Sequence, residues 1–169
     1  MNPQNVNKLR VKEIISLSPG IHLRLLQRFL GASFSTTRYH VRKLEEENQI
    51  IRSTFGGFER FFLAGTTAHM QDVYACLQNK RSRLVLQGII GSQQGLSQNS
   101  LLQVTKIHPT TIRAPINSLL EAGLIERFLT PDGRIMYGAV NKDEAAVLLA
   151  SFKTSMNSIT NNFIDLWEF

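Results

Sequence analysis

The residues whose types and spacing could support a chemical function lie between positions 35 and 43. They are Ser35, Thr36, Arg38, Tyr39, Arg42 and Lys43. Cationic and hydroxyl side chains of this kind hold the phosphate oxygens and base edges of nucleic acids. We find no paired carboxylates in a shared motif, no phosphate-binding glycine loop and no nucleophile with a base at useful spacing. The pattern therefore favours binding over catalysis, and we predict neither an enzyme nor a cofactor.

The distribution of charge also indicates the part of the chain that contains residues 35–43. The 169 residues carry a formal net charge of +6. Residues 1–65 hold 10 Lys/Arg against 5 Asp/Glu, whereas residues 66–169 hold 9 against 8. An excess of cations in one region attracts a polyanion. The first third of the chain is therefore the expected contact region.

Three helices are predicted to position these residues. The first, over 5–18, has Val6, Leu9, Ile14 and Leu17 on one face, and the second, over 21–30, ends at Gly31. We expect Ser35 to cap the third helix and Asn48 to end it in a left-handed conformation. Its inward face would be Thr37, Val41 and Leu44, so the six polar residues named above face outward.

A β-hairpin is predicted directly after the third helix. Two β-prone runs, 50–55 and 58–63, flank Gly56-Gly57, which is a strong hairpin signal. Arg52 and Arg60 lie on its two strands and would neutralise backbone charge. Phe55 and Phe58 flank the turn, and two interpretations stay open: a wedge into a minor groove, or packing against the following helix.

The same order of elements recurs in the second half. Helices are predicted over 81–90, 97–104 and 109–122, with Ser97 as a cap, and strands over 124–129 and 134–140 around a turn at 130–133. An offset of 75 maps Arg38 onto Arg113, Val41 onto Ile116, Leu44 onto Leu119, Asn48 onto Gly123, Ile50 onto Ile125 and Arg52 onto Arg127. A constant offset at core and helix-end positions indicates duplication of one fold.

Two further helices lie outside the repeats. An amphipathic linker helix is predicted over 67–80, and a long helix over 143–167. The apolar residues of the long helix step 4-3-4-3-4-3: Ala145, Leu149, Phe152, Met156, Ile159, Phe163 and Leu166. A heptad seam of this kind is typical of helix pairing. We therefore predict a homodimer whose contact residues are Leu149 and the five apolar residues that follow it.

Two segments of the first copy carry a family resemblance: Ser18-Pro19-Gly20-Ile21-His22 and Thr36-Thr37-Arg38-Tyr39-His40-Val41-Arg42-Lys43-Leu44-Glu45. Together with the order of helices and hairpin, they resemble archaeal winged-helix transcriptional regulators. The second copy, with Leu119-Leu120-Glu121-Ala122-Gly123-Leu124-Ile125, is similar to the MarR and ArsR repressor families. Residues 5–140 as a whole resemble predicted archaeal regulators with two such modules in tandem. The resemblance implies that the third helix of each copy enters a major groove while the hairpin reaches an adjacent groove or the backbone.

Within that docking mode the outward residues take different roles. Arg38 is placed to fork onto a guanine edge, whereas Arg42 and Lys43, one turn later, would meet phosphates. In the second copy the corresponding candidates are Arg113, Asn117, Arg127 and Arg134, a less basic set. Pro115 falls inside the predicted helix, which is therefore either kinked at Thr111 or begins later than residue 109.

Other residues have local interpretations. Leu25 and Phe29 either widen the core or dock another surface. His22 and His40 are interpreted as helix-start and packing residues, and with Cys76 they lack a metal-ligand spacing. The first residues do not resemble a signal peptide, so we expect a soluble, cytoplasmic, nucleoid-associated protein.

The sequence therefore predicts a mainly α fold with small β-hairpin wings. Its parts are a winged helix-turn-helix over 1–66, a linker helix over 67–79, a second winged helix-turn-helix over 80–140 and a dimerisation helix over 141–169. The expected function is sequence-specific binding of double-stranded DNA by a transcriptional regulator. The alternative is a protein-interaction or architectural DNA-binding module of the transcription or replication machinery. No residues specify a small-molecule effector.

Overall fold

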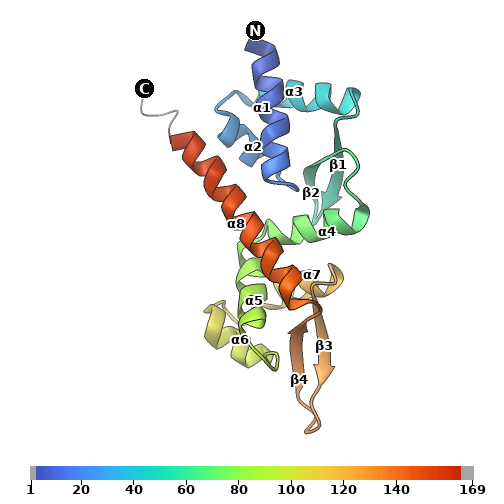
Figure 1. Cartoon of the computed structure of the whole chain (residues 1–169), viewed down its shortest axis with the longest axis vertical. Helices are drawn as coiled ribbons and strands as arrows, with labels where there is room; N and C mark the ends of the chain where they lie inside the picture. Colours follow the sequence, from blue (N-terminus) through green and yellow to red (C-terminus); the bar gives the residue numbers. More distant parts are fainter. Residues whose placement is uncertain (1–2, 165–169) are drawn as a thin grey trace. The chain divides into compact units, whose positions relative to one another are not determined.

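The computed structural model describes the backbone of residues 3–164 and the side chains of residues 6–159 (Figure 1). The elements in order are α1 (Pro3–Leu17), α2 (Leu23–Leu30), α3 (Phe34–Glu46), β1 (Ile50–Phe55), β2 (Phe58–Leu63), α4 (Ala68–Leu77), α5 (Lys80–Gly91), α6 (Gln98–Thr105), α7 (Arg113–Glu121), β3 (Ile125–Leu129), β4 (Ile135–Ala139) and α8 (Lys142–Ile164). Three helices followed by an antiparallel hairpin occur twice. The predicted fold class is confirmed.

The described residues divide into two compact units. One contains residues 3–71 together with 152–164, and the other contains residues 72–151. The first unit includes α1, α2, α3 and the hairpin β1–β2, which we call the first module. The second unit includes α5, α6, α7 and the hairpin β3–β4, which we call the second module.

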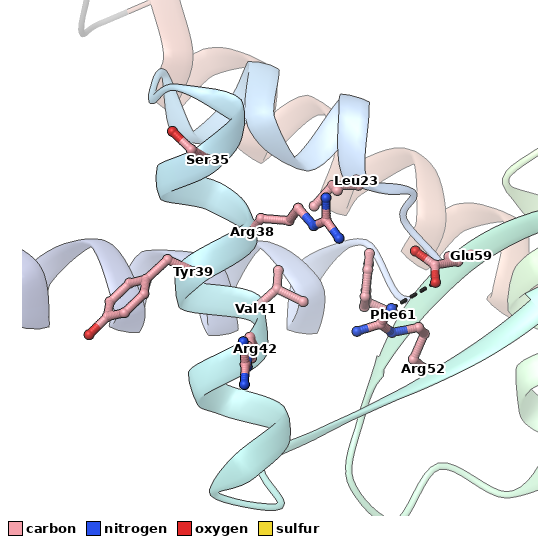
Figure 2. A pocket seen from close by; sticks show the side chains of 9 residues that line it. All are labelled: Leu23, Ser35, Arg38, Tyr39, Val41, Arg42, Arg52, Glu59 and Phe61. Atoms are coloured by element: carbon pink, nitrogen blue, oxygen red, sulfur yellow. Dashed lines mark hydrogen bonds and ion pairs between the residues drawn. The ribbon is translucent and has the colours of Figure 1, made fainter.

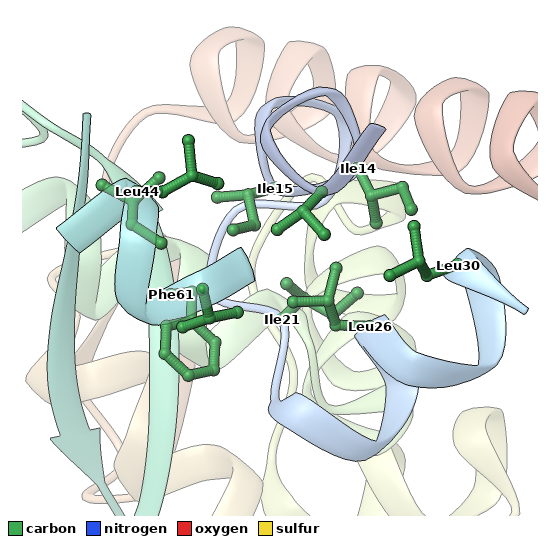
Figure 3. Packing of buried hydrophobic residues seen from close by; sticks show 10 residues of the cluster. Ile14, Ile15, Ile21, Leu26, Leu30, Leu44 and Phe61 are labelled. Carbon is green, nitrogen blue, oxygen red and sulfur yellow. The ribbon is translucent and has the colours of Figure 1, made fainter. Parts of the chain in front are cut away.

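The core of the first module is formed by apolar residues from every one of its elements (Figure 3). Val11 and Ile15 of α1, Leu26 of α2, Leu44 of α3 and Phe61 of β2 are each at most 1% exposed. Burial of a side chain of this size contributes about 1.5–3 kcal/mol, so these residues hold the three helices and the hairpin together.

The predicted inward face of α1 was wrong in part. Val6 is 39% exposed and Leu9 is 52% exposed, whereas Val11, Ile14 and Ile15 are buried. The buried set has the i, i+3, i+4 spacing of a helix face that packs on α2 and α3. The apolar residues of α1 allow either the predicted face or this one, and packing against α2 and α3 buries this one.

The third helix begins two residues earlier than predicted. Ser33, not Ser35, is the N-cap: its Oγ accepts a hydrogen bond of 3.1 Å from the backbone N–H of Thr36. The predicted inward face is confirmed, because Thr37, Val41 and Leu44 are 0%, 2% and 1% exposed. Asn48 ends the helix with φ 53°, the left-handed conformation that was predicted.

The first hairpin has the predicted bounds. Gly56 and Gly57 both have positive φ, 56° and 80°, as a two-residue turn with the twist of the strands requires. Phe61 also exchanges backbone hydrogen bonds with the loop between α1 and α2, since Gly20 N–H donates to its carbonyl at 2.8 Å and its own N–H donates to the Ile21 carbonyl at 3.0 Å. This bridge attaches the wing to the helical part of the module.

The second module repeats these features at the same offset. Leu26 and Leu101 are both fully buried, and so are Leu44 and Leu119, to within 1%. The left-handed residue that ends α2, Gly31, corresponds to Lys106, which ends α6 with φ 58°. The second wing has one more residue in its turn: Thr130 N–H donates to the Arg134 carbonyl across a loop that ends in left-handed Gly133.

Pro115 causes no break in α7, because the helix begins at Arg113 rather than at residue 109. Of the two predicted alternatives, the later start is confirmed. Pro115 is then the third helical residue, and the first turn-closing hydrogen bond runs from Ile116 N–H to the Ile112 carbonyl. The N–H that proline lacks would have had no partner in the helix in any case.

The long C-terminal helix is confirmed over Lys142–Ile164, and its predicted end at residue 167 lies outside the described residues. Its apolar stripe is already covered within one chain: Ala145, Leu149, Phe152 and Ile159 are 1–6% exposed. Among the described residues, no helix is both long and apolar enough to cross a membrane.

Candidate nucleic-acid interface

The outward face of α3 carries most of the predicted site residues. Ser35, Arg38, Tyr39 and Arg42 are exposed, and Lys43 retains 44% of its side-chain surface. Thr36 is different, because its Oγ1 lies 2.8 Å from the Ser33 Oγ. It is therefore part of the helix cap and only partly exposed.

The cations of this face differ in how they are paired. Arg42 Nε and Lys43 Nζ both donate to the carboxylate of Glu46, at 3.0 and 2.9 Å. Hydrogen bonding to Glu46 raises the pKa of Lys43. Exposed pairs of this kind contribute little to stability, so an anionic ligand can displace the carboxylate at small cost. Arg38 makes no ion pair or hydrogen bond within the described part of the chain.

The wing contributes Arg52, which two carboxylates hold in place. Its Nε and Nη2 donate to the two oxygens of Glu45 at 2.7 and 2.5 Å, and its Nη1 donates to Glu59 at 2.7 Å. These bonds, Glu45 first, raise the pKa of Arg52. The guanidinium also lies 5.7 Å from the centroid of the Phe61 ring. Arg52 is therefore fixed in orientation, but its charge is already compensated.

Arg60, the other wing cation that was predicted, faces into the module. Its Nη1 donates to the Gly20 carbonyl at 2.8 Å, and desolvation lowers its pKa. The structure thus gives Arg60 a role in attaching the wing to the α1–α2 loop. This differs from the predicted contact with the DNA backbone.

A cleft of about 360 Å³ separates α3 from the wing (Figure 2). Its lining includes Arg38 and Arg42 from α3 and Arg52, Glu59 and Phe61 from the strands. Figure 2 shows the side chains of Arg38 and Arg52 converging on this space, whereas Tyr39 points to the other side of α3. The structure therefore brings together cations from the helix and from the wing.

Two arginines that the sequence analysis did not select lie on α2. Arg24 and Arg28 are exposed, one turn apart, and line a second concave surface with His22, Gln27 and Phe34. Their i, i+4 spacing, opposite the buried Leu26–Leu30 stripe, is the signal that could have identified them. His22 caps α2, as its predicted helix-start role requires, by accepting a 3.3 Å hydrogen bond from Leu25 N–H at Nδ1. Desolvation, then Arg60 and Arg24, lower the pKa of His22.

In the second module the predicted site residues are exposed but fewer are cationic. Arg113 is the first residue of α7, Asn117 follows one turn later, and Arg127 lies on β3. Arg134 Nε donates to Asp132 at 2.6 Å in the wing turn. Among the described residues, Arg127 has no pair of carboxylates like the one around Arg52.

The two wings also differ in their exposed side chains. Thr54 faces Glu59 in the first wing, and the equivalent positions in the second are Leu129, 68% exposed, and Ile135, 45% exposed. Patches of exposed apolar residues are typical of protein contact surfaces. The second wing is therefore less suited than the first to a phosphate backbone.

Two pairs of apolar residues, Phe55 with Phe58 and Leu25 with Phe29, each have two interpretations from the sequence. Phe55 packs edge-on against Phe62, with ring centroids 5.9 Å apart, whereas Phe58 at the wing turn is 65% exposed. Phe55 thus packs within the hairpin, whereas its predicted packing against the linker helix stays untested, and packing is wrong for Phe58. Leu25 and Phe29 are half-buried against the core of the first module, which favours the widened core.

The predicted dimer residues are largely covered by their own chain. Leu149, Phe152 and Ile159 are buried, and Met156 is half-buried and accepts a 3.6 Å hydrogen bond from Ser18 Oγ. The side chains of Phe163 and Leu166 lie outside the described residues. The dimer stays a prediction, and this burial does not favour the stripe as its contact surface.

The described residues include no group of three or more His, Cys, Asp or Glu side chains that could hold a metal ion. Cys76 is buried, and desolvation raises its pKa to about 11. Its thiol is therefore protonated near neutral pH, which makes it a poor metal ligand and nucleophile. His40 is 3% exposed, in agreement with its predicted packing role.

Each module has three helices followed by a two-stranded hairpin, and an isolated bridge, Ile21–Phe61 in the first and Leu96–Tyr137 in the second, joins the hairpin to a loop between the helices. The topology is winged-helix-like, twice in tandem.

Comparisons with known proteins add little to this result. No family model and no curated protein matches the chain. Among solved structures, a conserved hypothetical protein from Chlorobium tepidum matches 98% of both chains, with 18% sequence identity and a TM-score of 0.30. A TM-score this low does not establish a common fold.

Proposed function

We propose that the chain is a sequence-specific regulator of transcription that binds double-stranded DNA through its first module. Helix α3 would lie in the major groove, and the wing would lie against the adjacent backbone. The observation that carries this proposal is the outward face of α3, where Arg38 is exposed and has no partner among the described residues.

The roles of the α3 residues follow from their pairing. Arg38 keeps all its guanidinium donors available, so it is suited to fork onto the O6 and N7 acceptors of a guanine. Arg42 and Lys43 share one exposed carboxylate, Glu46, and a phosphate would compete with it directly. Arg24 and Arg28 on α2 extend the cationic surface beyond the residues selected from sequence.

The test is binding of a labelled random-sequence duplex, measured by fluorescence anisotropy over a range of salt concentrations and followed by selection of preferred duplexes. Release of counterions makes the logarithm of the binding constant fall linearly with the logarithm of salt concentration. We expect a steep slope and enrichment of a defined sequence. Salt-dependent binding without enrichment would indicate an architectural binder, and no binding at any salt concentration would refute the proposal.

A second candidate function applies to the second module. Leu129 and Ile135 expose apolar surface where the first wing has Thr54 and Glu59. We propose that this module contacts protein rather than DNA. Exchanging both residues for their first-wing equivalents, Leu129→Thr with Ile135→Glu, should leave duplex affinity unchanged. A loss of duplex affinity greater than threefold would contradict this assignment.

A further inference from the structure

The cleft between α3 and the wing contains an acidic residue that a DNA-binding surface would not be expected to expose. Glu59 lines the cleft together with Arg38, Arg42 and Arg52, and its side chain is 51% exposed. A carboxylate repels phosphate, so its presence beside three cations requires an explanation.

The contacts of Arg52 give that explanation. Glu45, with a side chain only 22% exposed, takes the Nε and Nη2 edge of the guanidinium in a two-bond pair. Glu59, with a side chain 51% exposed, accepts a hydrogen bond from Nη1, and Figure 2 marks this contact. One carboxylate thus orients Arg52 from within the module, while the other occupies the donor that is accessible from the cleft.

The position of that donor matters for DNA docking. With α3 in a major groove and the wing on the adjacent backbone, the strand between them passes the cleft. Carboxylate and phosphate bind an arginine edge in the same way, through short charge-assisted hydrogen bonds. A phosphate that reaches the cleft therefore competes with Glu59 for Arg52.

We infer that Glu59 occupies the phosphate position of Arg52 in the free protein, is displaced when DNA is bound, and thereby lowers the affinity for DNA. This inference rests on the proposed function of the first module. Glu45 keeps Arg52 in place during the exchange, so the arginine is presented to the phosphate without reorientation. Displacing Glu59 weakens binding to every duplex by the same factor, so Glu59 lowers affinity without changing which duplex is preferred.

The experiment compares Glu59→Gln with a control that changes net charge equally. Glu13→Gln removes an exposed carboxylate of α1 that lies outside the cleft lining. Both variants and the unmodified full chain are titrated with the selected duplex and with a scrambled duplex, at several salt concentrations. Circular dichroism and thermal unfolding establish that the variants are folded.

Glu59→Gln should bind the scrambled duplex about fivefold more tightly than the unmodified chain, because one unfavourable charge close to the backbone is removed. The salt slope should stay about the same, because Arg52 contacts a phosphate in the complexes of both proteins. The selected duplex should gain by the same factor, so the preference for it should stay unchanged. Glu13→Gln should change affinity by less than twofold. Equal effects of the two variants would overturn the inference.

A measurement on the unmodified chain avoids any effect of substitution on folding. The side-chain carboxyl carbons of Glu45 and Glu59 are followed by NMR as the selected duplex is added. We expect the Glu59 signal to move while the Glu45 signal stays. A Glu59 signal that is unchanged at saturation would contradict the inference without affecting the proposed function, whereas a chain that binds no duplex would refute the proposed function itself.

Discussion

Across the first wing Thr54 faces Glu59, and across the second wing Leu129 faces Ile135. The same contrast extends to the helices: α3 presents Arg38, Arg42 and Lys43, whereas α7 has Arg113 as its only cation. Several buried positions, by comparison, are equivalent, among them Leu26 with Leu101 and Leu44 with Leu119. The two modules thus share a scaffold that is maintained by packing, while their surfaces differ in charge and polarity. The comparison teaches that a winged-helix-like fold by itself does not indicate which module binds DNA.

The largest effect is expected where the modules are alike. Leu44 and Leu119 occupy equivalent core positions and are at most 1% exposed. Substituting either by alanine should destabilise its own module by about 2–5 kcal/mol, because a cavity is left in a packed core. Denaturant unfolding of the two variants, followed by probes in each unit, would measure this. A tolerated substitution at one position would mean that the two cores are not equivalent.

The next effect distinguishes the two surfaces. Arg38→Ala should weaken binding of the selected duplex by about 1–3 kcal/mol, the range for loss of a two-bond contact with a base. Arg113→Ala, at the equivalent position by sequence offset, should weaken it less than twofold. Anisotropy titrations at one salt concentration provide the measurement. Similar losses for both variants would show that both modules contact DNA.

A smaller effect concerns the left-handed residues that end the second helix of each module. Gly31 adopts φ 66° without steric cost, whereas Lys106 adopts φ 58° with a Cβ that disfavours it. Lys106→Gly should therefore stabilise the second module, by about 1 kcal/mol at most. Lys106→Ala, which removes the same charge but keeps the Cβ, is the matched control. Equal unfolding midpoints for both variants would contradict the strain argument.

The smallest expected effect is a dependence of the first module's stability on pH. Desolvation lowers the pKa of both His22 and His40 in the folded protein. The unfolded chain, with histidine pKa values near 6.5, then binds more protons than the folded one. Stability is therefore complete above about pH 6.5 and decreases as the pH falls toward the lowered values. Denaturant midpoints at several pH values would show it, and His22→Asn, which keeps a capping side chain, should reduce the slope.

Much of the fold could be predicted from the sequence because its signals are local. Gly56-Gly57 determines the first hairpin, and the apolar spacing of Thr37, Val41 and Leu44 determines the buried face of α3. The cap was misplaced because residues 33–37 contain four hydroxyl side chains, Ser33, Ser35, Thr36 and Thr37, and only the backbone conformation selects Ser33.

The candidate site was harder to predict, since its interactions connect distant residues. The Gly20 carbonyl that binds Arg60 is 40 positions away, and it is reached only through the Ile21–Phe61 bridge. Glu45 and Glu59 lie seven residues on either side of Arg52, and they meet it because β1 turns back from α3 and pairs with β2. A list of cations by position does not show which of them are already compensated.

The central claim is that the first module, and not the second, contacts the DNA duplex. The most direct test is an amide NMR titration of the full chain with the selected duplex. Signals of α3 and of the β1–β2 wing should shift, with the largest changes around Arg38, while those of α7 and the β3–β4 wing should stay in place. Shifts confined to α7 and the second wing, or equal shifts in both modules, would contradict the account.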